Sequence, residues 1–379
     1  MNDHWHPSSD FDQDMLQLCN DHVKETFEGD RYGVIHPTRW LEASQWLLEG
    51  APSVETNFGL DDTVWQPSKQ LLSGNELGHS LLEDAKASAV SFREIYGRKP
   101  SVAVITVGDL NRYSHAKRRL QLYSNTGNSW FSKAATGEAN GFDVKEVQLD
   151  ALTTTDELLS QIYAVKDCDG IQLMWPLPDQ INTAKVYNAI DVAKDVDGIH
   201  YIGQLEIGNE KAYPPVTAAA TLALMERHGV ELKGKRVLVV GRSPIVGAPI
   251  AHMIRMKGGA TTVAHSDISA ELLKQLVGES DVIVTCAGSP GLIQADWIKN
   301  AQVINVGTTF LEETDSLHSD VSGDIGAHTA RYSPVPGGIG PLSLPFLLQN
   351  TARAAWSRMN DEGRVEATWE RTPATLKKT

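Results

Sequence analysis

The stretch VLVVGRSPIVGAPIAHMI, residues 237–254, runs from an apolar strand pattern through a glycine-containing turn into an amphipathic helix pattern. In such a unit, the backbone N–H groups at the helix N-terminus favour a phosphate group. Gly241 and Gly247 lack the usual glycine spacing of a dinucleotide turn, and Arg242 and Ser243 follow the first glycine. A guanidinium and a hydroxyl there favour an extra phosphate. The stretch predicts a Rossmann-type nucleotide site; the alternative is a tight turn with an exposed arginine.

The next strand pattern ends at His265 and Ser266, where this kind of fold reads the adenosine ribose or its 2′-phosphate. Arg242, Ser243 and Ser266 favour NADP. Asp267 favours NAD, unless it only caps the following helix. Two further strand patterns end at Gly288 and at Gly307, and these loops are expected to line the cofactor cleft.

The amino-acid composition limits the kinds of ligand that we expect. The formal net charge of −14 argues against nucleic acid as a partner, because that binding needs a basic surface. Cys19, Cys168 and Cys286 are odd in number and have no metal-type spacing, so we expect structural thiols, no metal site and a reducing compartment. The chain shows neither a signal peptide nor an apolar run of about 20 residues. We therefore expect a cytoplasmic protein that binds small molecules and no membrane.

A chain of 379 residues is too long for one ordinary domain. Alternating strand and helix patterns predict an α/β protein with parallel sheets. We expect a helical extension at 1–70, a first domain at 71–213, a Rossmann domain at 214–339 and a returning helix with a tail at 340–379. The extension is either a packed appendage or a ligand lid. The polar segment 124–141 is expected to be a surface insertion.

Three stretches of the chain are candidates for chemistry. Tyr113 and Lys117 are four residues apart on a predicted helix, and burial beside a phenol would help the lysine lose its proton; the alternative is a solvated surface pair. Asp197 in KDVDGIH is either a ligand carboxylate or a turn aspartate. The loop PVPGGIGP, residues 334–341, has a rigid backbone that would be costly for a simple connection.

Five motifs resemble, in order along residues 72–355, those of the methylenetetrahydrofolate dehydrogenase/methenyltetrahydrofolate cyclohydrolase family, the FolD type. They are the Tyr113–Lys117 pair, GIQLMWPLP, KDVDGIH, VGRSPIVGAP and PVPGGIGP. The resemblance implies oxidation of 5,10-methylenetetrahydrofolate by hydride transfer to NAD(P)+, followed by hydrolysis to 10-formyltetrahydrofolate. It also implies a folate-binding domain, a Rossmann domain and a homodimer.

The resemblance assigns roles to particular residues. Lys117 would assist the attacking water, Tyr113 would orient that lysine, and Asp197 would bind the pterin. Substrate contacts are implied at Met174, Pro176, Pro336, Gly337 and Gly338. Cofactor contacts, with NADP favoured and NAD left open, are implied at Gly241, Arg242, Ser243, Ile245, Gly247, His265, Ser266, Gly288 and Gly307.

One departure from the family concerns the second step. Met174 stands where the family has a glutamine that supports the lysine, and a thioether cannot donate a hydrogen bond. We do not expect Gln172 to replace it, because we expect that side chain on the opposite face. The hydride step would survive, whereas the cyclohydrolase step is open. The alternatives are a relative that uses the folate cleft for another one-carbon transfer, and a noncatalytic folate or nucleotide sensor.

Overall fold

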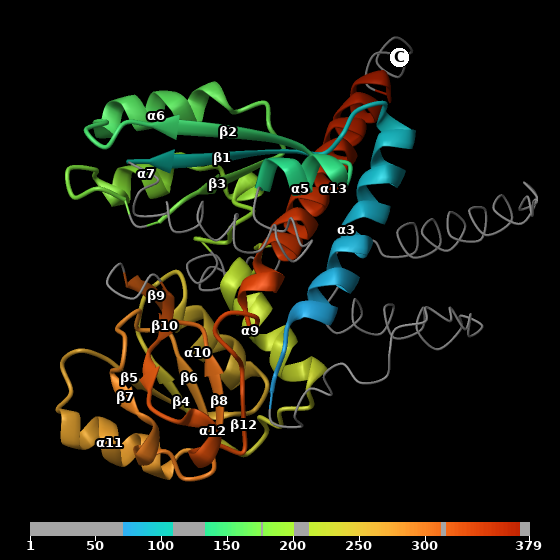
Figure 1. The fold of residues 1–379 in the computed structure, drawn as a ribbon. Helices are drawn as coiled ribbons and strands as arrows, with labels where there is room; N and C mark the ends of the chain where they lie inside the picture. The colour runs from blue at the N-terminus through green and yellow to red at the C-terminus, as the bar shows by residue number, and fades with distance from the viewer. Residues whose placement is uncertain (1–70, 109–132, 176, 201–211, 312–315, 372–379) are drawn as a thin grey trace, which may run out of the picture. The chain divides into compact units, whose positions relative to one another are not determined.

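The computed structural model describes residues 71–108, 133–175, 177–200, 212–311 and 316–371, all within one compact unit, Gln66–Thr379. These residues form two separate parallel sheets with their helices, as Figure 1 shows. The predicted α/β class is confirmed. None of the helices in the described ranges combines the length and hydropathy that crossing a bilayer requires.

The first domain is built on a three-stranded parallel sheet of order β2-β1-β3. The central strand β1 reads SVAVITV, and its apolar residues are buried because elements cover both faces. The strands are β1 (Ser101–Val107), β2 (Asp143–Leu149) and β3 (Gly170–Leu173). The helical segments are α5 (Lys133–Ala139), α6 (Thr155–Ala164), α7 (Thr183–Ala189) and η2 (Val192–Lys194).

The second domain contains a five-stranded parallel sheet of order β12-β8-β6-β4-β5. Its strands are β4 (Arg236–Val240), β5 (Ala260–Ala264), β6 (Val282–Thr285), β8 (Gln302–Asn305) and β12 (Arg331–Tyr332). Its helical segments are α10 (Gly247–Met256), α11 (Ala270–Glu279), η3 (Ala295–Trp297) and α12 (Ile325–His328). Smaller pairs join β7 (Ile293–Gln294) to β11 (Val321–Ser322), and β9 (Thr308–Leu311) to β10 (Ser316–Ser319).

Three helices contribute to the cores of both domains: α3 (Asn75–Tyr96), α9 (Val216–Arg227) and α13 (Gly340–Arg371). On α3, Leu81 packs against the core of the second domain, whereas Ala85 and Ala89 lie in the core of the first. The helix therefore presents one apolar stripe to two cores in succession. Helices α3 and α13 run side by side (Figure 1).

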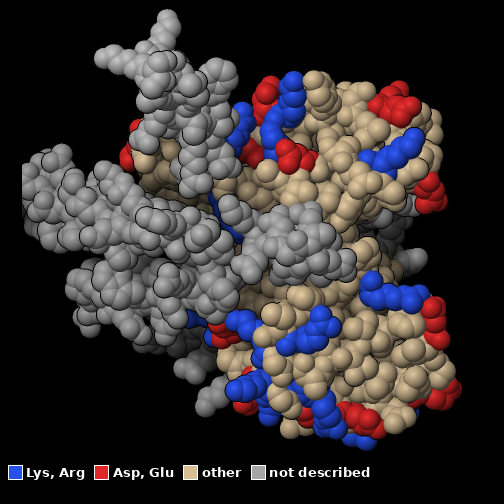
Figure 2. Space-filling view, turned by 180° about the vertical axis from the view of Figure 1, so that it is seen from behind, with Lys and Arg blue, Asp and Glu red and all other residues tan. Residues whose placement is uncertain are grey.

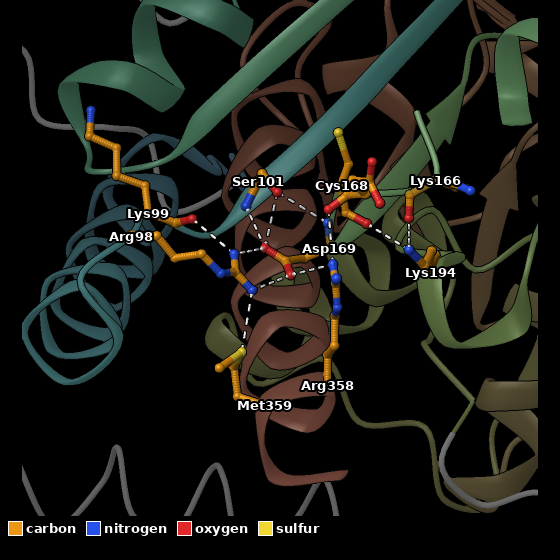
Figure 3. Close-up of polar contacts among 10 residues, drawn as sticks. Arg98, Lys99, Ser101, Lys166, Cys168, Asp169, Lys194, Arg358 and Met359 are labelled. Atoms are coloured by element: carbon orange, nitrogen blue, oxygen red, sulfur yellow. Dashed lines mark hydrogen bonds and ion pairs between the residues drawn. The ribbon is translucent and has the colours of Figure 1, made fainter. Parts of the chain in front are cut away.

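At the amino-terminal edge of the first sheet, Asp169 bonds to residues at the start of β1, as Figure 3 shows. Its fully buried carboxylate accepts two bonds from the Arg98 guanidinium, at 2.7 and 2.8 Å. It also accepts bonds from the backbone N–H of Ser101 at 2.9 Å and from its hydroxyl at 3.0 Å. Arg358 of α13 lies 3.6 Å from the same carboxylate. One buried anion thus joins β1, β3 and α13.

The expectation that 124–141 is a surface insertion was wrong for its second half. Residues 133–139 form α5, in which Thr136 and Gly137 are buried. A Cβ on Gly137 would lie 2.3 Å from Cγ2 of Val144, so the helix lies close against β2. The physical reason is that two parallel strands need a crossover connection, usually helical. The extension 1–70 and the predicted helix at 113–123 lie outside the described residues.

Candidate functional site

The turn between β4 and α10 explains the unusual glycine spacing. Gly241 has φ +130°, and a Cβ there would lie 2.6 Å from the carbonyl oxygen of Cys286. A Cβ on Gly247 would lie 2.2 Å from the carbonyl oxygen of Gly241. The two glycines therefore let the start of α10 pack directly against the turn. Burial raises the pKa of the Cys286 thiol to about 12, which fits a structural thiol.

Arg242, beside this turn, is paired with an acidic residue. Its guanidinium donates to the Asp267 carboxylate at 2.8 Å, and the Ser266 hydroxyl donates to the same carboxylate at 3.2 Å. Nδ1 of His265 lies 3.6 Å from it. The bonds from Arg242 and Ser266 lower the pKa of Asp267. Arg242 and Ser266, which were predicted to favour a 2′-phosphate, thus surround a carboxylate together with His265.

The alternative role of Asp267 as a helix cap was wrong. Ser269 is the N-cap of α11, and its hydroxyl accepts a bond from the N–H of Leu272. Asp267 precedes this cap and faces Arg242 instead.

The loops at Gly288 and Gly307 meet at one buried carboxylate that sequence reasoning missed. Asp320 is fully buried and accepts bonds from the backbone N–H groups of Ala287 at 2.8 Å and Ser289 at 2.7 Å. A Cβ on Gly307 would lie 2.1 Å from Oδ2 of Asp320. Asp320 therefore bonds to the loop around Gly288 and packs closely against Gly307. Burial raises the pKa of Asp320 against the opposing effect of the backbone bonds.

Two other predicted site segments have defined contacts. Ile245 packs against an apolar cluster of the first domain. In the PVPGGIGP loop, Gly337 has φ +107°, and its carbonyl accepts a bond from the N–H of Gly74 at 2.9 Å. A Cβ on Gly338 would lie 2.8 Å from the carbonyl oxygen of Pro334. The loop, which includes Pro336, therefore packs closely against itself and the start of α3.

A lysine, a glutamine, a methionine and an aspartate meet beside the first sheet. The Lys133 ammonium donates to Oε1 of Gln172 at 2.5 Å and contacts Sδ of Met174 at 3.0 Å. Nε2 of Gln172 donates to Oδ1 of Asp197 at 3.0 Å. Lys133 begins α5, Gln172 lies in β3, Met174 directly follows β3, and Asp197 follows η2. The amide therefore bridges a cation and an anion.

The surroundings shift the proton affinities of both charged groups. Burial lowers the pKa of Lys133, although Asp197 and Glu146 act in the opposite direction. Burial raises the pKa of Asp197 to about 6, against the opposing effects of Lys133 and Gln172. A lysine with a lowered pKa can act as a base or an acid nearer to neutral pH, which suits proton transfer.

The structure separates the two possible roles of the aspartates in KDVDGIH. Asp195 is the turn residue, because its carboxylate accepts bonds from the backbone N–H groups of Ile199 and His200 at 3.1 and 2.8 Å. It also contacts Nδ1 of His200 at 2.9 Å. Asp197 instead faces Gln172. The loop is thus organised by Asp195, and Asp197 keeps a place beside the lysine.

The expectation that Gln172 faces away from Met174 was wrong. Successive residues of a strand alternate between faces, so residues two apart lie on the same face. Gln172 and Met174 accordingly contact the same ammonium. Tyr113, Lys117 and Pro176 lie outside the described residues, and the prediction for them stays a prediction.

Sequence reasoning missed Lys133. It lay within the segment interpreted as an insertion, although it starts the helix directly before β2. The need for a crossover between β1 and β2 was the available signal, because it places a helix, and its first side chain, beside the sheet.

Comparisons with known proteins agree with this architecture. Residues 72–197 match the family model of the tetrahydrofolate dehydrogenase/cyclohydrolase catalytic domain, and residues 215–359 match that of its NAD(P)-binding domain. The chain belongs to the tetrahydrofolate dehydrogenase/cyclohydrolase family. It is accordingly an NAD(P)-dependent enzyme of tetrahydrofolate chemistry.

Relatives within this family cover about three quarters of this chain. The bifunctional protein FolD of Lactococcus lactis is 35% identical over 298 residues, which are 77% of this chain and 98% of that protein. FolD of Sorangium cellulosum is 34% identical, over 76% of this chain and 98% of that protein.

Solved structures of the family are similar in fold. The Campylobacter jejuni FolD structure has a TM-score of 0.66 at 30% identity, covering 76% of this chain and 99% of its own. The Trypanosoma brucei FolD structure, complexed with NADP cofactor and inhibitor, has a TM-score of 0.67 at 30% identity, covering 78% and 99%.

The residues of the second domain fit a dinucleotide. A Cβ on Gly241 or Gly247 would collide with neighbouring backbone, so the glycines allow the tight turn that can present backbone N–H groups at the start of α10 to a pyrophosphate. Arg242 supplies a cation at the strand end beside Ser266. On the described part of the face in Figure 2, basic and acidic side chains are interspersed, as expected when binding depends on a local site.

Proposed function

We propose that this chain oxidises 5,10-methylenetetrahydrofolate to 5,10-methenyltetrahydrofolate and hydrolyses the product to 10-formyltetrahydrofolate, with Lys133 as the lysine of the second step. The family models support the reaction class. The observation that carries the residue assignment is the contact of the Lys133 ammonium with Gln172, the bonding partner of Asp197. NADP is the favoured hydride acceptor, and NAD is an alternative.

In the first step, the chain mainly binds and orients the substrate. Asp197 lies at the site as a carboxylate that can accept N–H bonds from the pterin, and Pro336, Gly337 and Gly338 form a rigid loop that would cover it. Bound NAD(P)+ accepts the hydride. Orientation of bound reactants can supply much of the rate enhancement without an acid or a base. Gly241, Arg242, Ser243, Gly247, Gly288 and Gly307 would hold the nucleotide, with His265, Ser266 and Ile245 beside it.

In the second step, Lys133 handles protons. Water adds to the methenyl carbon and gives one proton to the Lys133 amine. The bond from that carbon to N5 then breaks; N5 keeps the electron pair and takes a proton from the Lys133 ammonium. The hydroxyl proton passes to solvent as the formyl group forms. A lysine whose pKa is lowered can both accept and donate a proton near neutral pH.

The test follows reduced nicotinamide and methenyl absorbance independently, with methylenetetrahydrofolate and with NADP or NAD. We expect Lys133→Met to lower the methenyl-consuming rate by about 100-fold or more, because general acid–base catalysis typically contributes that much. Lys117→Met is the matched comparison, since the family resemblance implied Lys117 as this lysine. A large loss in Lys117→Met and none in Lys133→Met would reverse the assignment. No reduced nicotinamide with either nucleotide would refute the reaction itself.

The setting of the enzyme is also part of the proposal. A homodimer is supported by the family resemblance, and a cytoplasmic location by cysteines that are widely spaced and odd in number. The division into 1–70, 71–213, 214–339 and 340–379 is supported by the family matches at 72–197 and 215–359. Size-exclusion chromatography with light scattering tests the dimer directly.

A further inference from the structure

We propose that Gln172 is the positioning residue for Lys133 and replaces, from two residues earlier on the same strand face, the amide that Met174 removes. This inference rests on the proposed function. It implies that the cyclohydrolase step is retained despite Met174.

The geometry allows only one orientation of the Gln172 amide. The Lys133 ammonium offers only donors, so it must face the amide oxygen, and the contact is 2.5 Å. An ionised Asp197 offers only acceptors, so it must face the amide nitrogen, and that contact is 3.0 Å. Both neighbours demand the same orientation, so the amide is locked between them.

Position on the strand makes this substitution possible. Gln172 pairs with Val104 of β1, and the N–H of Met174 continues the ladder by donating to Ile105 at 2.9 Å. Both side chains therefore project from one face of an extended segment. Gln172 is 7% exposed, so its bonds to Lys133 and Asp197 are shielded from water.

Met174 alone cannot position Lys133 in this way. Its thioether is a weak acceptor and has no donor, so it can contact the ammonium but cannot bond to Asp197 at the same time. An amide does both. Gln172 thereby fixes Nζ of Lys133 in place and couples it to Asp197.

The experiment removes the amide and then returns it at the neighbouring position. We expect Gln172→Leu to lower the cyclohydrolase kcat by about 10- to 100-fold, as misplacement of a catalytic group does, and to lower the dehydrogenase rate much less. The double variant Gln172→Leu/Met174→Gln should recover the cyclohydrolase rate to within about 3-fold of wild type. Gln275→Leu, an exposed glutamine on α11, is the control.

A second readout reports on the lysine without turnover. Loss of the accepting oxygen disfavours the ammonium, so Gln172→Leu should shift the pH dependence of Lys133 acetylation, followed by mass spectrometry, to lower pH. The double variant should move it back.

Three results would overturn the inference. They are an unchanged cyclohydrolase rate in Gln172→Leu, an equal loss of both activities without recovery in the double variant, and a wild-type enzyme that accumulates methenyltetrahydrofolate. The last leaves the dehydrogenase proposal standing, whereas absence of reduced nicotinamide would end that proposal as well.

Discussion

Replacing Asp197 by asparagine should stabilise the protein while impairing the site. The carboxylate is poorly solvated where it lies, and burial raises its pKa from 3.8 to about 6. An asparagine has nearly the same shape, and its oxygen can still accept the bond from Nε2 of Gln172. The substitution therefore removes the cost of an ionised group without opening a cavity.

The magnitude of this gain depends on pH. A group whose pKa rises on folding binds its proton more tightly in the folded state, so its contribution to stability falls as the pH rises from about 4 to about 7. A rise from 3.8 to about 6 corresponds to about 3 kcal/mol at pH 8. Roughly half of this is present at pH 5. The gain in stability from Asp197→Asn should therefore be about 1 kcal/mol larger at pH 8 than at pH 5.

Urea unfolding at pH 5 and pH 8, followed by circular dichroism, measures the free energy of unfolding of both proteins. Asp143→Asn, at an exposed position where β2 begins, is the matched control and should change stability little at either pH. A variant no more stable than wild type at pH 8, or one whose gain is the same at both pH values, would refute the reasoning. In the same preparations the folate KM should rise, because a ligand carboxylate is lost.

Three further substitutions test other parts of the structure. Asp169→Ala should cost about 3 kcal/mol in urea unfolding, because it leaves the Arg98 guanidinium without its buried partner, while exposed Glu83→Ala should cost little. Gly247→Ala would place a Cβ 2.2 Å from the Gly241 carbonyl oxygen and should raise the Kd for NADP, measured by calorimetry, by about 10-fold or more. Gly340→Ala is the control and should leave the Kd unchanged, because a Cβ there meets nothing within 4 Å. Asp267→Ser removes a carboxylate that repels a 2′-phosphate and should raise the ratio of kcat/KM for NADP over NAD by about 10-fold at low salt; an unchanged ratio would separate cofactor choice from this residue.

Much of the nucleotide-binding half was predictable because its signals are local. The apolar run of β4, the turn at Gly241 and the helix pattern of α10 are contiguous, and each follows from the period of its element. The pairing of Arg242 with Asp267 was harder to predict from the sequence. It needs two strand ends to meet, and sequence alone left a capping role open for Asp267, which Ser269 fills.

The first domain shows more clearly what could not be predicted from the sequence. A short local motif selected Lys117, whereas the structure brings Lys133 to Gln172, 39 positions away, and Gln172 to Asp197, 25 positions away. Asp320 was missed for the same reason, because its carboxylate serves backbone groups 33 and 31 positions earlier. Contacts between distant residues leave no periodic trace in the chain.

By itself, the sequence determined the α/β class, the two sheets, the turn that suits a dinucleotide and the family of the enzyme. These follow from residue patterns repeated over a few neighbouring positions and from several motifs in a shared order. Only the tertiary structure showed that Gln172 joins Lys133 to Asp197. The physical reason is that parallel strands connected by long crossovers bring their carboxyl ends to one edge, where side chains far apart in the chain share one site.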